Sequence, residues 1–160
     1  MFILKIIKYL IQAILIYLFF FIINFIGLNL SRKLFSSLFC IIGPLIKSEK
    51  IINNNLKKFL GAQNQDIKKK IKHKMWENYG KTFVEYLYLE KFRKIDSHIE
   101  IKGGEILEKL QKINEPVIFV SGHFANFELM SMELTKRNFK LATIYRPLNN
   151  FFLNPLMEYL

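Results

Sequence analysis

The sequence predicts an α/β protein that one N-terminal helix anchors in a membrane, and three observations lead to this prediction. Residues 9–30 carry no charged side chain and are long enough, as a helix, to cross the hydrocarbon core of a bilayer. Helical patterns fill the middle of the chain. Near its end, two short apolar segments that contain β-branched residues enclose a further helical pattern. We therefore expect a transmembrane helix, a helical segment, and then the start of a mixed or parallel sheet with helices.

Composition narrows the class of protein. The chain has 160 residues, which is room for one modest domain, and 51% of them are hydrophobic, which excludes a disordered chain. The formal net charge of +11 favours an anionic partner: nucleic acid, anionic lipid headgroups and an acidic protein all fit, as does simple compositional drift towards lysine. The single cysteine, Cys40, allows no intrachain disulfide and no zinc site, so we expect it to be a small buried residue.

The uncharged stretch is interpreted as an uncleaved membrane anchor, which we place at residues 1–33. A cleaved signal peptide has a shorter apolar core and a small-residue exit, and no such exit follows this stretch. A buried core helix of this length without a charge is uncommon. Lys5 and Lys8 precede the stretch, whereas Arg32, Lys33 and further lysines follow it closely. The positive-inside rule therefore favours a cytoplasmic body.

Residues 34–62 are expected to form a connector of two short segments. The apolar run at 34–46 is too short to span a bilayer and is interrupted by Gly43 and Pro44. It is expected either to lie in the membrane interface or to pack on the domain. Residues 48–60 are polar with spaced apolar positions, which predicts a short amphipathic helix that ends near Gly61.

The remaining residues, 63–160, are expected to hold the α/β domain, and its first element is a long helix. Asn64 is a good N-cap, and apolar residues recur every four positions from Ile67 to Phe83, which predicts one apolar face. The lysines at 68, 69, 72 and 74 lie on the other side and are expected to be solvated. The aromatic segment that follows, 86–92, is expected to pack in the core.

A turn, a short helix and a strand are predicted next. Gly103 and Gly104 mark the turn, and residues 105–112 have a helical pattern. Pro116 then ends the helix and opens the apolar run at 117–120. Short runs of this kind are typical of strands that are buried on both faces, as in parallel sheets.

A helix at 124–137 and a second strand at 140–145 complete a right-handed βαβ unit. Asn154 and Pro155 suit the start of another helix, with an N-cap followed by proline at the first position. Two strands alone are seldom stable. We therefore expect the chain to be the N-terminal part of a longer protein.

The segment 121–128, Ser-Gly-His-Phe-Ala-Asn-Phe-Glu, lies where the first predicted strand ends, which is the edge at which open α/β sheets bind ligands. His123 in the loop and Glu128 on the second turn of the helix can meet. A carboxylate that accepts a hydrogen bond from one ring nitrogen leaves the other nitrogen free as a general base. Gly122 allows close approach of a substrate, and Asn126 can hydrogen-bond a substrate oxygen. The plainer alternative is a structural histidine at a strand end.

Other chemistries fit the sequence less well. Ser121 lies near His123 but lacks the Gly-x-Ser-x-Gly elbow of a serine nucleophile, and Cys40 has no local partner. The sequence also has no Gly-rich loop of the kind that cradles phosphates, and no set of metal ligands.

Several segments resemble one family, the lipid A late acyltransferases, also called lauroyl/myristoyl acyltransferases, within the wider lysophospholipid acyltransferase group that is marked by His-x4-Asp/Glu. Residues 122–129 resemble the family's Gly-His-Phe-Gly-Asn-Trp-Glu block, with Ala125 in place of glycine and Phe127 in place of tryptophan. Residues 145–150, Tyr-Arg-Pro-Leu-Asn-Asn, and residues 154–160 resemble the next block. The N-terminal anchor also fits, as do three residues of the long helix: Asn78, Gly80 and Glu85.

The resemblance implies an incomplete acyltransferase fold and direct acyl transfer in lipopolysaccharide biosynthesis at the bacterial inner membrane. His123 would take the proton of a hydroxyl on a lipid A precursor, and the oxygen would attack the thioester of a fatty acid on acyl carrier protein. Glu128 would orient His123, and Arg146 would hold an anionic group of the acceptor, with Asn126 and Gly122 as further substrate contacts. The resemblance implies no metal, no cofactor and no nucleic acid.

Three alternatives remain open at this point. The chain is an inactive, truncated, membrane-tethered module, or it is an acyltransferase that acts on another phospholipid or lysophospholipid acceptor. The third alternative is a membrane-bound hydrolase in which His123 activates water.

Overall fold

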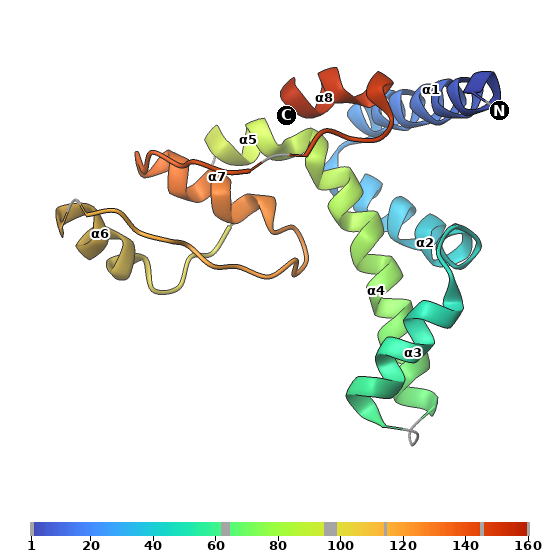
Figure 1. Ribbon diagram of the computed structural model, residues 1–160, viewed down its shortest axis with the longest axis horizontal. Helices are drawn as coiled ribbons and strands as arrows, with labels where there is room; N and C mark the ends of the chain where they lie inside the picture. The colour runs from blue at the N-terminus through green and yellow to red at the C-terminus, as the bar shows by residue number, and fades with distance from the viewer. Residues whose placement is uncertain (1, 62–64, 95–98, 114, 145, 160) are drawn as a thin grey trace. The chain divides into compact units, whose positions relative to one another are not determined.

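The computed structural model describes residues 2–61, 65–94, 99–113, 115–144 and 146–159 (Figure 1). Within these ranges the regular elements are α1 (Phe2–Ile26), α2 (Leu28–Ile46), α3 (Glu49–Leu60), α4 (Gln65–Glu85), the 3-10 turn η1 (Tyr86–Tyr88), α5 (Leu89–Lys94), α6 (Gly104–Ile113), α7 (Glu128–Lys136), the 3-10 turn η3 (Phe151–Leu153) and α8 (Asn154–Tyr159). The chain divides into two compact units. The α4 unit is Leu15–Leu87, and the α7 unit joins Met1–Ile14 to Tyr88–Leu160.

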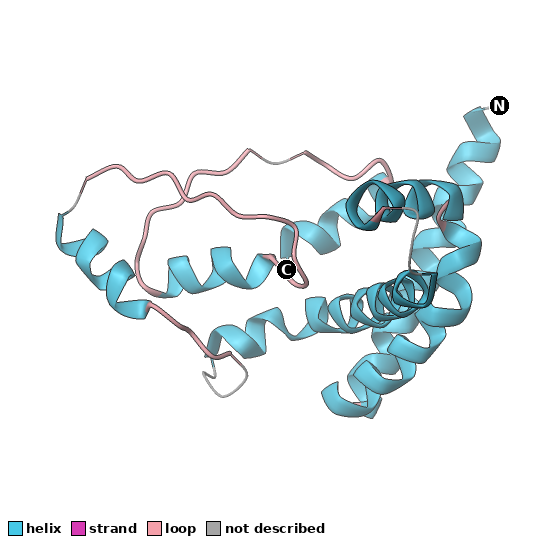
Figure 2. Cartoon of the chain, turned by 90° about the horizontal axis from the view of Figure 1, so that it is seen from below, coloured by secondary structure: helices cyan, strands magenta, loops and turns pink. Residues whose placement is uncertain are grey.

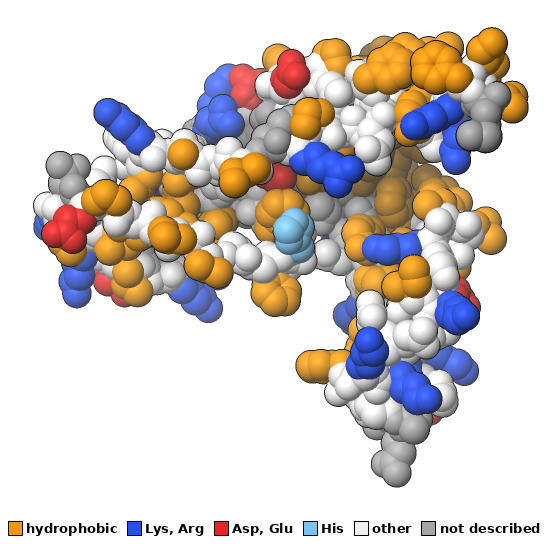
Figure 3. Space-filling view, viewed as in Figure 1, with side chains coloured by type: hydrophobic (Ala, Val, Ile, Leu, Met, Phe, Trp, Pro, Cys, Tyr) orange, Lys and Arg blue, Asp and Glu red, His pale blue; other side chains and the backbone are white. Residues whose placement is uncertain are grey.

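α1 is the apolar helix that the sequence predicted at the N-terminus. Among the described residues it is the one helix that is long and apolar enough to cross a membrane. Most of its side chains are exposed, including Leu10, Leu18 and Phe25, and Figure 3 shows hydrophobic side chains along it. The helix ends at Ile26, before the uncharged stretch ends, because Gly27 takes a left-handed φ of 77°.

The core of the α4 unit is the contact between α2 and α4, which run side by side (Figure 1). Gly43 of α2 faces the indole of Trp76, and a Cβ at Gly43 would lie 2.3 Å from that ring. The Ser36 hydroxyl donates a hydrogen bond to the Glu77 carbonyl oxygen at 3.1 Å. Small residues on α2 therefore let the two helices approach closely, in the way that small residues do wherever helix backbones meet.

The buried stripe of α4 is shifted by one position from the one that the sequence predicted, although Met75 and Phe83 of the predicted face are half-buried. The predicted apolar face includes three residues that are exposed: Ile67, Ile71 and Tyr79. The buried residues are the neighbouring stripe, one position further along: Lys68, Trp76, Gly80 and Val84. Gly80 is the reason, because its missing side chain admits the backbone of α2 and turns this face of the helix inward. The expectation that Lys68 is solvated is therefore wrong.

An aromatic cluster completes the α4 unit around Phe83. The centre of its ring lies 5.1 Å from that of Phe20, 5.6 Å from that of Phe35 and 5.5 Å from that of Phe39. Contacts between aromatic rings at these separations add to the stabilisation from hydrophobic burial. Since Phe20 belongs to α1, the cluster attaches the second half of α1 to α2 and α4.

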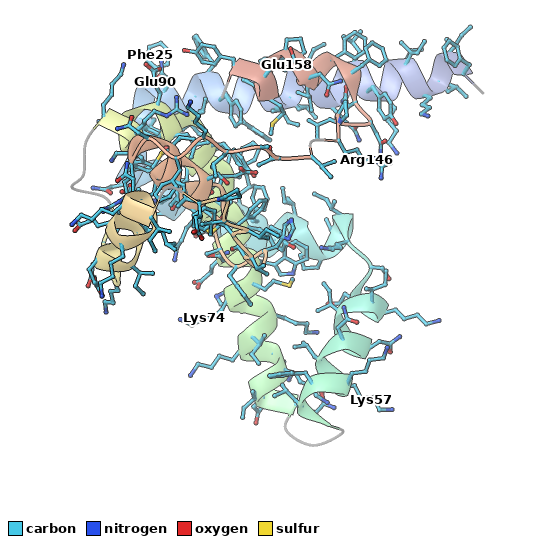
Figure 4. All side chains as sticks on the ribbon, turned by 60° about the vertical axis from the view of Figure 1, so that its left-hand side comes forward. Phe25, Lys57, Lys74, Glu90, Arg146 and Glu158 are labelled. Atoms are coloured by element: carbon cyan, nitrogen blue, oxygen red, sulfur yellow. The ribbon has the colours of Figure 1, made fainter. Side chains whose placement is uncertain are left out.

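The described part of the predicted connector, residues 34–61, is largely helical in the structure. The run at 34–46 lies within α2, and α3 follows Ser48 and ends before Gly61, which has a φ of 73°. The predicted cap at Asn64 lies outside the described residues. Lysines cover the outer surfaces of α3 and α4 in Figure 3, and Figure 4 shows Lys57 and Lys74 pointing away from the two helices.

The α7 unit consists of short helices that long loops connect (Figure 2). α5 packs against α7, and the buried side chains there include Phe92, Met132 and Leu134. The Gln111 side chain of α6 donates a hydrogen bond to the Arg137 carbonyl oxygen at 2.7 Å, just after the end of α7. The predicted turn, at Gly103 with a φ of 78°, and the short helix after it are both confirmed.

The predicted sheet is absent from the described part of the chain, so the α/β prediction is wrong. Residues 115–120 and 140–144 run as loops, and no βαβ unit forms (Figure 2). Ile118, Val120 and Ile144 are 90%, 89% and 106% exposed. A strand is stable when neighbouring strands pair with its backbone and cover its side chains. The described neighbours of these two segments do neither, so their β-branched side chains alone do not produce strands.

Candidate active site

An irregular loop, residues 121–127, leads from the first extended segment into α7. The Phe124 amide donates a hydrogen bond to the Gly122 carbonyl oxygen at 2.8 Å, which closes a tight three-residue turn. Ala125 has a φ of 47°, in the left-handed region that non-glycine residues seldom adopt. Because of these bends, the helix starts later in the sequence than predicted. The predicted start at Phe124 is therefore wrong, and α7 begins at Glu128.

His123 is exposed on this loop. The centre of its ring lies 4.3 Å from that of Phe127, and the two ring planes meet at 53°. An imidazole at such a place is open to a substrate. His123 therefore lies in the loop before α7, with its side chain exposed.

Glu128 is the first residue of α7 and is half-buried. The sequence placed it on the second turn of the helix, and the late start of α7 moves it to the first. A carboxylate at a helix N-terminus interacts favourably with the unpaired amides and the dipole there. Among the described residues, no hydrogen bond or ion pair joins the Glu128 carboxylate to the His123 ring, which lies against Phe127.

Gly122 and Asn126 shape the loop on either side of His123. A Cβ at Gly122 would lie 2.5 Å from the Phe124 ring, so a larger residue would displace that ring. Asn126 is 8% exposed, and its carbonyl oxygen accepts a hydrogen bond from the Leu129 amide at 3.3 Å. Asn126 therefore lies beneath the loop, where it helps to start α7.

Arg146 is exposed on the second long loop, which leads into η3 and α8 (Figure 4). The Leu148 amide, two residues on, donates a hydrogen bond to the Asn154 side-chain oxygen at 2.9 Å. Asn154 opens α8, as the sequence predicted. The loop that carries Arg146 is thus held by a side chain of the helix that follows it.

Asn150 is a positioning residue that the sequence did not single out. It is 8% exposed, its side-chain amide donates to the Tyr9 carbonyl oxygen at 2.9 Å, and its side-chain oxygen accepts from the Phe152 amide at 3.2 Å. The Tyr9 and Phe151 rings also meet edge to face. A signal for this role is present in the sequence, because asparagine is among the preferred residues for capping the start of a helical turn.

Two further residues of the family pattern have structural roles in the α4 unit. Glu85 accepts a hydrogen bond from Arg32 Nε at 3.0 Å, and Nη2 of the same guanidinium lies 2.7 Å from the same carboxylate oxygen in an ion pair. Gly80 lies in the contact between α2 and α4. Asn78, by contrast, is exposed.

Two cavities flank α7 within its unit. One of about 610 Å³ is lined by residues 115–119, by residues 138–143 and by Leu134. The other, of about 360 Å³, is lined by residues 99–102 together with Leu129 and neighbouring side chains. His123 lines neither of them.

Side chains that bind metals are scattered. In the described ranges, no three His, Cys, Asp or Glu residues gather in a group that could hold a metal ion. Cys40 is half-buried rather than buried as predicted, and its thiol approaches the His73 carbonyl oxygen at 3.7 Å.

Comparison with known families identifies one match. The family described as bacterial lipid A biosynthesis acyltransferase matches residues 3–159. No curated protein and no solved structure matches the chain. The family match includes the His123 loop and the Arg146 loop, and it confirms the resemblance that these segments suggested.

Proposed function

The chain belongs to the bacterial lipid A biosynthesis acyltransferase family, and from this premise we propose that it transfers a fatty acyl chain from an acyl-carrier-protein thioester to a hydroxyl of a lipid A precursor. Membership of the family assigns the chain to the acyltransferases of lipid A biosynthesis. The observation that carries the finer proposal is the loop before α7, which holds an exposed histidine.

His123 acts as the general base in this proposal. One ring nitrogen takes the proton of the acceptor hydroxyl while the oxygen forms a bond to the thioester carbonyl carbon. The carbon–sulfur bond then breaks, and the thiolate of the carrier takes the proton back from the imidazolium. The products are an ester and a free thiol, so no other reactant is needed. A base of this kind accelerates a reaction by about 10²–10⁴.

Glu128 is proposed to orient the base. Its carboxylate would accept a hydrogen bond from the second ring nitrogen and stabilise the imidazolium that forms. For this contact the His123 ring must turn away from Phe127, against which it lies. Glu128 starts α7, and only the loop residues 124–127 separate it from His123 in the sequence. Hydrogen bonds of catalytic groups often tighten only when substrate is bound.

Arg146 is proposed to bind the acceptor. A guanidinium donates two parallel hydrogen bonds to a phosphate or carboxylate, and Arg146 is exposed on its loop. Gly122 and Asn126 are proposed as the remaining substrate contacts. Gly122 keeps the backbone beside His123 open, and Asn126 connects the loop to α7.

The membrane is the proposed place of this reaction. α1 is long and apolar enough to cross a bilayer. We propose that it anchors the chain once in the bacterial inner membrane, with residues 34–62 as a connector and residues 63–160 on the cytoplasmic side. The net charge of +11 suits anionic lipid and an acidic carrier protein.

An acyl-transfer assay tests the proposal. Membranes that contain the protein are given an acyl chain on acyl carrier protein, with a lipid A precursor as acceptor, and the acylated lipid is measured by mass spectrometry. We expect transfer to the lipid A precursor, and little release of free fatty acid.

The controls separate the alternatives. Lysophosphatidic acid replaces the lipid A precursor in one reaction, and acceptor is omitted from another. Faster transfer to lysophosphatidic acid would assign the protein to another acceptor. Thioester hydrolysis without transfer would make it a hydrolase, and folded protein without either reaction would make it a non-catalytic module.

A further inference from the structure

α2 carries an apolar stripe that no part of the described α4 unit covers. Leu30, Leu34, Ile41 and Leu45 are 51%, 51%, 71% and 84% exposed. At about 100° per residue these four side chains fall within about 60° of one another around the helix. Single exposed hydrophobic residues are ordinary, whereas a continuous exposed row on one helix marks a contact surface.

The other side of α2 is already occupied. Its buried residues, among them Ser31, Phe35 and Gly43, belong to the face that packs against α4. The side chains of the stripe therefore cannot be buried by rotating α2 towards the core, because rotation would separate Gly43 from Trp76. The helix has two apolar faces, and the α4 unit uses one.

The polar residue within the stripe already has a partner. Ser37 lies between Leu34 and Ile41, and its hydroxyl donates to the Lys33 carbonyl oxygen at 3.1 Å, within the helix. A hydroxyl that already has a partner costs much less to bring near lipid than an unpaired one.

Lys47, which follows the last residue of α2, and Tyr79 of α4 are side chains of the kinds that favour a membrane surface. The Lys47 amine donates to the Tyr79 hydroxyl at 3.2 Å and lies 5.2 Å from the centre of its ring. Tyrosine and lysine are common at the level of lipid headgroups, where a ring or an alkyl stem meets lipid while the polar end meets water.

α2 follows almost directly after α1 in the sequence. α2 begins at Leu28, and only Gly27 separates it from the end of α1 at Ile26. Resting on the proposed membrane attachment of α1, we propose that α2 is a second membrane contact. Its stripe enters the boundary between headgroups and acyl chains of the same bilayer, to the depth of about 5–10 Å at which amphipathic helices lie.

Spin labels on single cysteines test this placement. In a Cys40→Ser background, nitroxides are attached at Ile41→Cys and Leu45→Cys, and the protein is placed in vesicles of phosphatidylethanolamine and phosphatidylglycerol. Leu18→Cys on α1 reports membrane attachment, and Asn54→Cys on the exposed surface of α3 reports water. Collision rates with oxygen, which concentrates in lipid, and with a water-soluble nickel chelate are compared.

We expect the oxygen-to-nickel ratio at Ile41→Cys and Leu45→Cys to be several-fold above that at Asn54→Cys and near that at Leu18→Cys. Ratios equal to that at Asn54→Cys, with a high ratio at Leu18→Cys, would overturn the inference and leave the anchor standing. Low ratios at all sites would also contradict the proposal that α1 anchors the protein in the membrane. Labels on α2 that are immobilised but low in oxygen would show that protein covers the stripe, which also overturns the inference.

Discussion

Gly80 of α4 lies directly against the backbone of Phe35 in α2: a Cβ at Gly80 would come within 2.3 Å of the Phe35 carbonyl oxygen and 2.6 Å of its carbonyl carbon. Backbone atoms cannot move aside as a flexible side chain can. The identity of this one residue therefore determines how closely the two helices approach, and through them the position of the aromatic cluster at Phe83.

Gly80→Ala is expected to destabilise the α4 unit. The added methyl group forces α2 and α4 apart, and overpacking of this kind costs about 1–3 kcal/mol or more. Denaturant unfolding followed by circular dichroism in detergent micelles measures the loss. Lys81→Ala, at the neighbouring exposed position, is the control and should leave stability nearly unchanged. Equal stability of the two variants would show that the close contact is not formed.

Arg32 and Glu85 should be energetically coupled. Their side chains are 31% and 13% exposed, so removing one partner leaves the other partly buried without its main contact. Arg32→Met and Glu85→Gln should each cost about 1–3 kcal/mol. The double variant should lose less than the sum of the two in the same unfolding measurement. Simple additivity of the two losses would mean that the pair contributes nothing as a pair.

The pair Glu90 and Lys94 on α5 is expected to make the stability of the folded state depend on pH. A hydrogen bond from the Lys94 amine, together with its positive charge, holds the pKa of Glu90 below its ordinary value. Because the pKa is lowered in the folded state, the stabilisation is present above the ordinary pKa of glutamate. It is lost as the pH falls through the lowered pKa of the folded state.

Lys94→Met should therefore raise the pKa of Glu90 towards its ordinary value, as followed by NMR titration of its side-chain carboxyl carbon. Lys91→Met is the matched control, since the Lys91 amine lies over the Tyr88 ring at 5.9 Å from its centre. An unchanged pKa of Glu90 in the Lys94→Met protein would refute the assignment.

The hydrogen bond between Asn150 and Tyr9 bears on the orientation of α1. Tyr9 lies about 25 Å along the helix from Ile26, at about 1.5 Å per residue. If α1 crosses the membrane and the body follows it on the cytoplasmic side, Tyr9 reaches the far side, so the contact with Asn150 must open. In membranes, a Tyr9→Cys and Asn150→Cys pair in the Cys40→Ser background should then form no disulfide. Efficient crosslinking there would mean that α1 lies beside the α7 unit and does not cross.

Local signals predicted many of the helices. The amphipathic pattern at 48–60 predicted α3, which begins after Ser48 and ends before Gly61, and Gly103 ends a turn where the chain needs a positive φ. Local signals could not show whether a sheet forms, because Ile118 and Ile144 become strand residues only when other strands cover them. The α4 stripe was missed for a similar reason: the sequence shows which residues are apolar but not where α2 approaches.

The candidate site, like the fold, could be predicted only in part from local signals. The loop around His123 was predicted, since glycine before a polar residue suits a bend, and the histidine lies in that loop. The position of Glu128 on the first turn of α7 was not predicted. The left-handed turn at Ala125 makes the helix start later in the sequence, and an alanine gives no clear sign of such a turn. Asn150 was missed because its partner, the Tyr9 carbonyl oxygen, lies far away in the sequence.

Replacement of His123 tests the central proposal most directly, with His73 as the matched control. His73 lies on α4, and its ring nitrogen is 3.5 Å from the Glu77 carboxylate, so it also pairs a histidine with a nearby acid. Both alanine variants are assayed for transfer from acyl carrier protein to the lipid A precursor. His123→Ala should lower the rate by about 10²–10⁴ with an unchanged circular dichroism spectrum, and His73→Ala should keep it within a few-fold of the parent. Near-parental transfer by folded His123→Ala protein would contradict the account.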